Sequence, residues 1–241
     1  MRPLFILLPI LLASSLVAEA AEPRRESIDE VALRIGPGVY GIGNVTLYNA
    51  TRTLTIPGRV NRQSGSIKLL ACAPEGKTHE SLLILDVDPI HLHNALLLLD
   101  LRYGRNLRFL GDPKPPEGDP VELYVEWEDE EETIRHRAED LVLDIVNMRT
   151  MPHTHWAFAG SRVMEGRFAA SEDGTLITTY NDPNTILANP LETGAVEDIY
   201  EANPLMIPPE DTPITLILFA PEVDRRIPIF DEEFKPAPDE N

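Results

Sequence analysis

The chain has little cysteine, little positive charge and few long apolar runs. Its single cysteine, Cys72, excludes an internal disulfide bond, so the fold has to be stabilised by its core alone. Lys and Arg together number 21 against 40 Asp and Glu, which gives a formal net charge of −19. Because nucleic-acid binding depends on basic contacts to phosphate, this balance excludes nucleic acid as a partner. The sequence also has no Gly-rich phosphate loop, GxSxG elbow or HExxH helix, and therefore no complete catalytic motif.

The one long apolar run stands at the start of the chain, at Leu4–Val17. Arg2 precedes it and Ala18-Glu19-Ala20 follows, which is the order of regions in a secretory signal peptide with cleavage after Ala20. The run is shorter than the about 20 residues that cross a bilayer, and Pro9 interrupts it. We therefore predict a signal peptide at residues 1–20. Its removal on export leaves a periplasmic or extracellular protein without a membrane span.

The mature chain has the length of a single domain. Its about 220 residues bury a sizeable core without a second domain. The 22 prolines are nearly double the usual share of roughly 5%, which favours a loop-rich domain over a helical bundle. We predict an N-terminal extension at 21–43 and one domain at 44–220. The mix of charge and proline beyond it indicates an acidic, flexible tail at 221–241.

Local patterns predict strands and one main helix. β-forming residues on both sides of a turn predict a hairpin over 45–56, and the apolar run Ser81–Val87 predicts a buried strand. Strict alternation over Val121–Trp127 is typical of a half-buried strand. Asp88 is a candidate N-cap for a helix at about 89–101. We predict an α+β fold, a mainly antiparallel or mixed β-sheet with this helix packed on it.

Six stretches, in order along the chain, resemble one known domain. They are CAPEGKTHESLL at 72–83, HLHNALL at 91–97, GDPV at 118–121, AEDLV at 138–142, WAFAGS at 156–161 and YNDP at 180–183. Together they resemble the YdjY-type domain of exported bacterial proteins, over roughly residues 44–219. That family has no established activity, so the resemblance implies an exported envelope domain and transfers no catalytic residues.

Potential metal ligands are densest at Cys72, His79, Glu80, His91 and His93. Thiolate, imidazole and carboxylate are the usual ligands of zinc and related metals. Adjacent residues on a strand, such as His79 and Glu80, point to opposite faces. Residues two apart on a helix, such as His91 and His93, lie about 200° apart. Neither pair can therefore chelate one ion in regular structure. One hypothesis therefore takes Cys72, His79 and His93 from three elements, with Glu80 as a fourth partner. The competing interpretation buries Cys72 as a small apolar residue and has the histidines bond backbone groups.

Two further candidates carry less chemical information. His153 and His155 face the same way if the chain is extended there, so they form a possible shared site, although the pair also fits a loop that enters a strand. The acidic run Glu128–Glu132 lacks the spaced oxygen ligands and the bend-forming glycine of a calcium loop, which favours a solvated hairpin tip.

Two functions remain open at this point. The missing catalytic motifs and the export signal favour a non-catalytic binding or interaction module of the cell envelope. Its partner would be an unknown envelope protein or small ligand. The alternative is a metal- or thiol-dependent enzyme centred on Cys72 and His79, in which the imidazole lowers the pKa of the thiol. The sequence identifies no cofactor.

Overall fold

The computed structural model describes residues 32–130 and 132–223. The predicted signal peptide and residues 224–241 of the predicted tail lie outside the described residues. Within the described ranges, no helix has the length and apolar character needed to cross a membrane.

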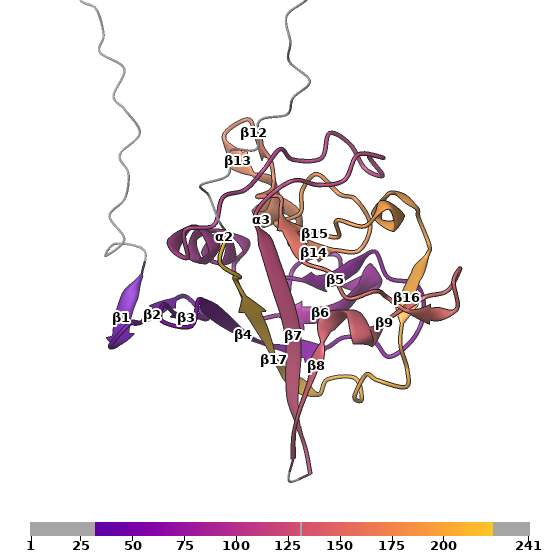
Figure 1. Cartoon of the computed structure of the whole chain (residues 1–241), viewed down its shortest axis with the longest axis horizontal. Helices are drawn as coiled ribbons and strands as arrows, with labels where there is room; N and C mark the ends of the chain where they lie inside the picture. Colours follow the sequence, from indigo (N-terminus) through magenta and orange to yellow (C-terminus); the bar gives the residue numbers. More distant parts are fainter. Residues whose placement is uncertain (1–31, 131, 224–241) are drawn as a thin grey trace, which may run out of the picture.

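Eight strands close into a β-barrel (Figure 1). In order around the barrel they are β4 (Thr53–Val60), β17 (Pro213–Phe219), β7 (Pro120–Asp129), β11 (Trp156–Phe158), β15 (Leu187–Ala188), β14 (Thr175–Thr178), β5 (Leu69–Cys72) and β6 (Ser81–Leu85). β5 runs parallel to β6 and β14 runs parallel to β15, whereas the other neighbours are antiparallel. The barrel closes where β6 pairs with β4.

Closure depends on a close backbone approach between β4 and β6. Gly58 pairs with Leu85, and Val60 pairs with Leu83. A Cβ atom on Gly58 would lie 2.4 Å from the carbonyl oxygen of Ile84, so only glycine fits at this position without displacing backbone. A glycine inside a strand therefore marks the point at which the sheet closes.

The predicted α+β fold, a sheet with one main helix packed on it, is wrong. The described residues form a mostly β structure whose central sheet is a closed barrel, and they contain two α-helices, α2 (Pro89–Leu98) and α3 (Ala169–Asp173). The cause of the error is physical. Closure joins β4 to β6 and β11 to β15 across long loops, and the local alternation of residues carries no information about which strand edges meet.

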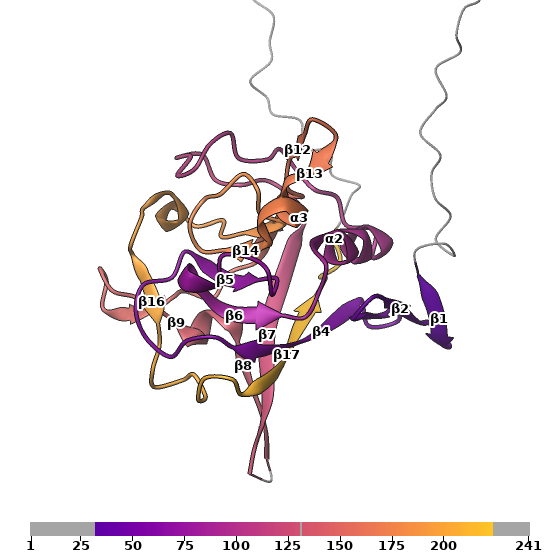
Figure 2. The same ribbon diagram turned by 180° about the vertical axis from the view of Figure 1, so that it is seen from behind.

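The predicted hairpin over 45–56 is confirmed as β3 (Val45–Tyr48) and the first half of β4. Residues from the predicted N-terminal extension add β1 (Leu33–Gly36) and β2 (Val39–Ile42) to its outer edge. Seen from behind in Figure 2, these strands project from the barrel as a side arm.

The predicted helix is confirmed as α2, which ends at Leu98 rather than Leu101. Asp88 caps it as expected, because its carboxylate accepts a hydrogen bond of 3.1 Å from the backbone N–H of Ile90. α2 contacts β2, β3 and α3, and it contributes Leu92 to the main core. It therefore lies beside the arm at the edge of the barrel and not across a sheet face (Figure 2).

Smaller elements fill the connections. They are η1 (Thr78–Glu80), β8 (Glu132–Arg137), η2 (Ala138–Leu141), β9 (Val142–Asp144), β10 (Arg149–Thr150), β12 (Val163–Met164), β13 (Arg167–Phe168), η3 (Glu192–Ala195) and β16 (Tyr200–Ala202). β8 pairs with β7 outside the barrel path, and β10, β9 and β16 form a separate three-stranded sheet.

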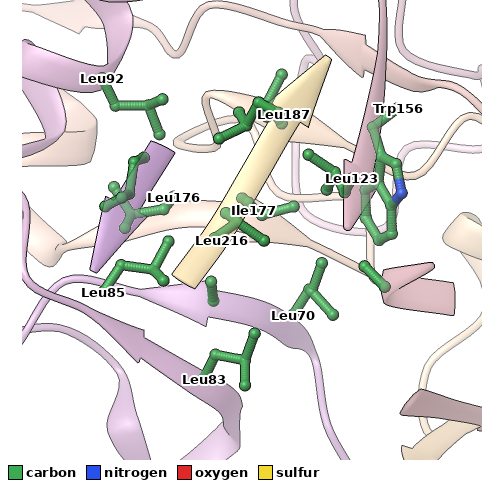
Figure 3. Packing of buried hydrophobic residues seen from close by; sticks show 14 of the residues in the cluster. Leu70, Leu83, Leu85, Leu92, Leu123, Trp156, Leu176, Ile177, Leu187 and Leu216 are labelled. Atoms are coloured by element: carbon green, nitrogen blue, oxygen red, sulfur yellow. The ribbon is translucent and has the colours of Figure 1, made fainter. Parts of the chain in front are cut away.

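The core consists mainly of aliphatic side chains, together with large aromatic residues such as Trp156 and Phe158. Alternation on β7 buries Val121, Leu123 and Val125, which confirms the predicted half-buried strand. Leu123 faces Leu218 and Val125 faces Leu216 on the neighbouring β17, so matching registers bring their inward side chains together. Figure 3 shows this packing, with Trp156 beside Leu123.

Candidate functional site

Cys72 is a buried core residue on β5. It is fully inaccessible to solvent and packs in a small apolar cluster with Leu69 and Ile84. Burial raises the pKa of its thiol, and a hydrogen bond with Ser81 only partly opposes this. A catalytic thiol needs the opposite shift, toward the thiolate, so this environment gives the sulfur the character of an inert apolar group.

His93 lies in a different environment, on α2. Its ring packs against Tyr103, Phe158 and Phe168, with centroid distances of 5.6, 5.4 and 5.0 Å. Burial lowers its pKa to about 4, so the imidazole is neutral at physiological pH. Nδ1 is buried without a hydrogen-bond partner in the described part of the chain.

His79 and Glu80 belong to the short helix η1, where His79 is exposed and Glu80 is half-buried. The backbone carbonyl of His79 accepts a hydrogen bond from Arg62. The four residues proposed as metal ligands thus lie in three different environments and are not brought together. Among the described residues, no group of three or more His, Cys, Asp or Glu side chains is arranged to hold a metal ion.

The second histidine pair also separates. His153 contacts Asp140 through Nε2 at 2.7 Å, whereas His155 contacts Glu122 through Nε2 at 3.0 Å. Each imidazole therefore contacts its own carboxylate, and the two histidines share no binding partner. Beside them, Arg137 at the end of β8 pairs with the fully buried Glu139 of η2, which also accepts a hydrogen bond from Trp156 of β11.

The thiol of Cys72 is expected to resist modification in the folded protein. Its zero exposure and raised pKa remove both access and thiolate character. Labelling with 5,5′-dithiobis(2-nitrobenzoate) at pH 8 should release almost no chromophore from native protein and close to one equivalent per chain in 6 M guanidinium. Rapid stoichiometric labelling of native protein would contradict this placement.

Lys77 joins two carboxylates that are distant in the sequence. Its Nζ lies 2.9 Å from Asp173 Oδ2, at the end of α3, and 2.8 Å from Asp182 Oδ2, in the loop between β14 and β15. Burial alone would lower the pKa of Lys77, but hydrogen bonds to the two carboxylates outweigh it and raise the pKa. The ammonium therefore stays charged and holds three segments together.

A hydrogen-bond chain extends this ion pair toward a third loop. Asn184 donates through Nδ2 to Asp173 at 2.8 Å and through its backbone N–H to Asp182 at 2.8 Å. Arg162 then donates through Nε to Asn184 Oδ1 at 2.7 Å. Burial opposes the negative charge on Asp173, but the hydrogen bonds from Asn184 and Lys77 lower its pKa below the ordinary value of 3.8.

Arg108 supplies a third cation, fixed by a buried carboxylate. Its Nε and Nη2 each donate to Asp112 at 2.8 Å, and the Asp112 side chain is only 2% exposed. These hydrogen bonds from Arg108 hold the pKa of Asp112 well below its usual range. The Arg108 side chain is 55% exposed, so the cation of this pair is the partner that is open to solvent.

The loop that carries Arg108 is pinned to the loop between β14 and β15. The backbone N–H of Gly111 donates to the carbonyl of Asn181 at 2.7 Å, and the Asn181 side chain donates to the carbonyl of Asp112 at 2.7 Å. Asn106 donates to the carbonyl of Pro183 at 2.9 Å. These bonds fix the position of Arg108 relative to Lys77.

The side chains of these loops line a hollow of about 350 Å³, which we call the Lys77 cleft. Its lining consists of Lys77, Arg108, Phe109, Leu110, Arg162, Asp182, Pro183 and Asn184. Phe109 and Leu110 are 50% and 58% exposed, so an apolar edge stands beside the cations. The cleft thus combines cations held in place by carboxylates or an amide with exposed apolar side chains.

Sequence analysis did not single out these residues. Lys77 and Asp182 lie inside two of the stretches that resemble the family, at 72–83 and 180–183, but their side chains carried no recognised spacing. About a hundred residues separate the two partners along the chain, and only the fold brings them within hydrogen-bond distance. A pair of this kind leaves no local signal in one sequence.

Comparison with known proteins identifies the family. The family model of the YdjY domain matches residues 45–219. The chain therefore belongs to the YdjY domain family. This confirms the resemblance seen in the sequence, and the matched span contains all eight barrel strands and every residue of the Lys77 cleft. Neither the curated proteins nor the solved structures contain a match to the chain.

Proposed function

We propose that this YdjY-domain protein is an exported, non-catalytic binding module whose Lys77 cleft binds a small ligand with an anionic group. The observation that carries the proposal is the difference in exposure between cations and carboxylates. The side chains of Asp112 and Asp182 are 2% and 10% exposed, whereas the side chain of Arg108 is 55% exposed. In a chain of net charge −19, the cleft gathers three cations from three separate loops.

Arg162 is the principal anchor in this proposal. Its Nε is committed to Asn184, while its two terminal nitrogens have no hydrogen-bond acceptor among the described residues. A guanidinium edge of this kind binds a carboxylate or phosphate through two parallel hydrogen bonds. The apolar edge formed by Phe109 and Leu110 favours a carboxylate that is attached to an apolar group.

The state of the ionisable groups supports binding over catalysis. Lys77 has a raised pKa and is therefore a poor base or nucleophile at neutral pH. The thiol of Cys72 is buried and its pKa is raised as well. No geometry in the described residues favours the alternative of a thiol- or metal-dependent enzyme centred on Cys72 and His79.

Export is part of the proposal and rests on the signal-like segment at residues 1–20. Expression of the full chain in a bacterial host, followed by fractionation and N-terminal sequencing, tests it. The expected product is an envelope or secreted protein that begins at Ala21. A cytoplasmic product that retains residues 1–20 would contradict export.

The binding proposal is tested by NMR titration with two matched probes. N-acetyl-leucine carries a carboxylate and an apolar side chain, whereas N-acetyl-leucine amide lacks the charge. The first is expected to shift the Nε signal of Arg162 and the backbone signals of Phe109 and Leu110, and the second to leave them unchanged. Arg162→Met removes the proposed hydrogen-bonded ion pair with the ligand carboxylate. It should therefore weaken binding of N-acetyl-leucine by about ten-fold or more.

Arg149→Met is the matched control. Arg149 is 61% exposed on β10 and lies outside the cleft, so its loss removes the same charge without touching the proposed anchor. Equal weakening of binding by both variants would show that the effect comes from net charge alone. Titration shifts confined to other surfaces would refute the cleft as the binding site.

A further inference from the structure

The β7–β8 hairpin extends past the barrel wall. β7 pairs with β17 only as far as Glu126, whereas its pairing with β8 continues to Asp129 opposite Glu132. In Figure 1 the hairpin points away from the rest of the molecule. Its outer part therefore has no neighbouring strand on the β17 side.

The two faces of the hairpin differ in character. On one face, Glu126 pairs with Arg135, and Glu128 accepts a hydrogen bond from Thr133. On the other face, Trp127 stands opposite Ile134 in the strand register. Alternation thus collects the two polar pairs on one side, and the apolar residues on the other together with Asp129 near the tip.

The apolar face forms one wall of a groove of about 500 Å³. The segment Leu205–Pro209, between β16 and β17, forms the other wall. Leu205 is 91% exposed, and His136 packs beside Trp127 with their ring centroids 5.5 Å apart. We call this site, between the hairpin and residues 205–209, the hairpin groove.

The outer rim of the hairpin groove is negative. Glu128 and Asp129 line it, and Glu130 and Glu132 follow at the tip of the hairpin. No Lys or Arg is among the lining residues, and the carboxylate of Asp129 has no ion-pair or hydrogen-bond partner in the described ranges. The groove therefore combines the exposed side chain of Leu205, next to the partly buried Ile134 and the largely buried Trp127, with acidic charge at Asp129 that has no partner in the described ranges.

We propose that the hairpin groove is a docking site for an extended segment of another protein in which apolar residues alternate with Lys or Arg. Apolar side chains would contact Leu205, Ile134 and the edge of Trp127, which is 8% exposed, and the cations would lie beside Asp129. Charge complementarity selects this occupant over a second copy of the chain, because each copy carries a net charge of −19. The site is separate from the Lys77 cleft, with which it shares no lining residue.

Two synthetic hexapeptides test the proposal on the mature protein. In one, lysine alternates with leucine, and in the other, glutamate replaces lysine. The chain has two tryptophans, and Trp156 is fully buried, so the indole N–H signal of Trp127 in ¹⁵N NMR reports on the groove. The lysine peptide is expected to shift this signal in a saturable, salt-sensitive titration, and the glutamate peptide to leave it in place.

Variants on the surface locate the contact without disturbing the core. Leu205→Ser should weaken binding of the lysine peptide by about ten-fold, because a leucine that becomes buried on binding is lost. Asp129→Asn should weaken it by about five-fold at low salt. Glu165→Gln removes one charge from a side chain that is 87% exposed near β12, and it should leave the affinity unchanged.

Three outcomes would overturn the proposal. The first is equal binding of the two peptides, and the second is a Trp127 signal that does not move with millimolar lysine peptide. The third is a shift of the Trp127 signal with protein concentration alone, which would assign the groove to a second copy of the chain.

Discussion

Replacing Glu139 by alanine is expected to destabilise the fold by about 3–5 kcal/mol, the cost of removing one partner from a buried ion pair. The Glu139 side chain is fully buried and accepts hydrogen bonds from Arg137 at 3.0 Å, Trp156 Nε1 at 3.0 Å and the backbone N–H of Thr154 at 3.2 Å. Alanine would leave a half-buried guanidinium and two buried N–H groups without this acceptor. Urea unfolding followed by circular dichroism measures the loss.

Glu126→Ala is the matched control for this prediction. Glu126 pairs with Arg135 on the same hairpin, but the Arg135 side chain is 56% exposed. Loss of such a surface pair is expected to change the free energy of unfolding by about 0–1 kcal/mol. A similar small effect for Glu139→Ala would show that the carboxylate does not organise this part of the barrel.

The second large effect is expected for Lys77→Met. This change leaves the carboxylates of Asp173 and Asp182 close together, 23% and 10% exposed, without their shared cation. Because the site is partly exposed, we expect a loss of about 1–3 kcal/mol, below that of a fully buried pair. Lys77→Met should also reduce binding of N-acetyl-leucine in the NMR titration, since the loop that carries Asp182 and Asn184, the partner of Arg162, loses this anchor.

Lys68→Met provides an unusually close control for Lys77→Met. Both lysine side chains are 29% exposed, but Lys68 pairs with Glu197, whose side chain is 53% exposed. The expected loss of stability for Lys68→Met is therefore about 0–1 kcal/mol. Equal losses for the two variants, measured by urea unfolding, would contradict the bridging role of Lys77.

Features of the fold that depend on neighbours in the sequence were predictable. The Asp88 cap, the hairpin between β3 and β4 and the alternation of β7 all follow from residues a few positions apart. The barrel was not predictable by the same means. Its closure rests on the pairing of β4 with β6 and on strands as short as β15, with two residues, which show no periodicity.

The candidate site also has one part that the sequence could indicate and one part that it could not. The stretch at 72–83 was recognised as informative, but attention went to the thiol of Cys72 and the imidazole of His79 because these groups carry chemistry in many proteins. The fold places Cys72 in the core and makes Lys77 the residue that joins the loops. Residue type alone could not distinguish a reactive side chain from a packed one, because burial and long-range pairing decide that difference.

The ammonium group of Lys77 provides the most direct test of the account, because its bridge between Asp173 and Asp182 joins three segments at the cleft. A raised pKa in the folded state means that this bridge stabilises the fold below the ordinary lysine pKa of 10.5 and that the gain is lost as the pH rises through the folded-state value. NMR titration of the Lys77 side chain is expected to give a midpoint above 10.5, which Asp182→Asn lowers. A midpoint at or below 10.5 that does not respond to Asp182→Asn would contradict the account.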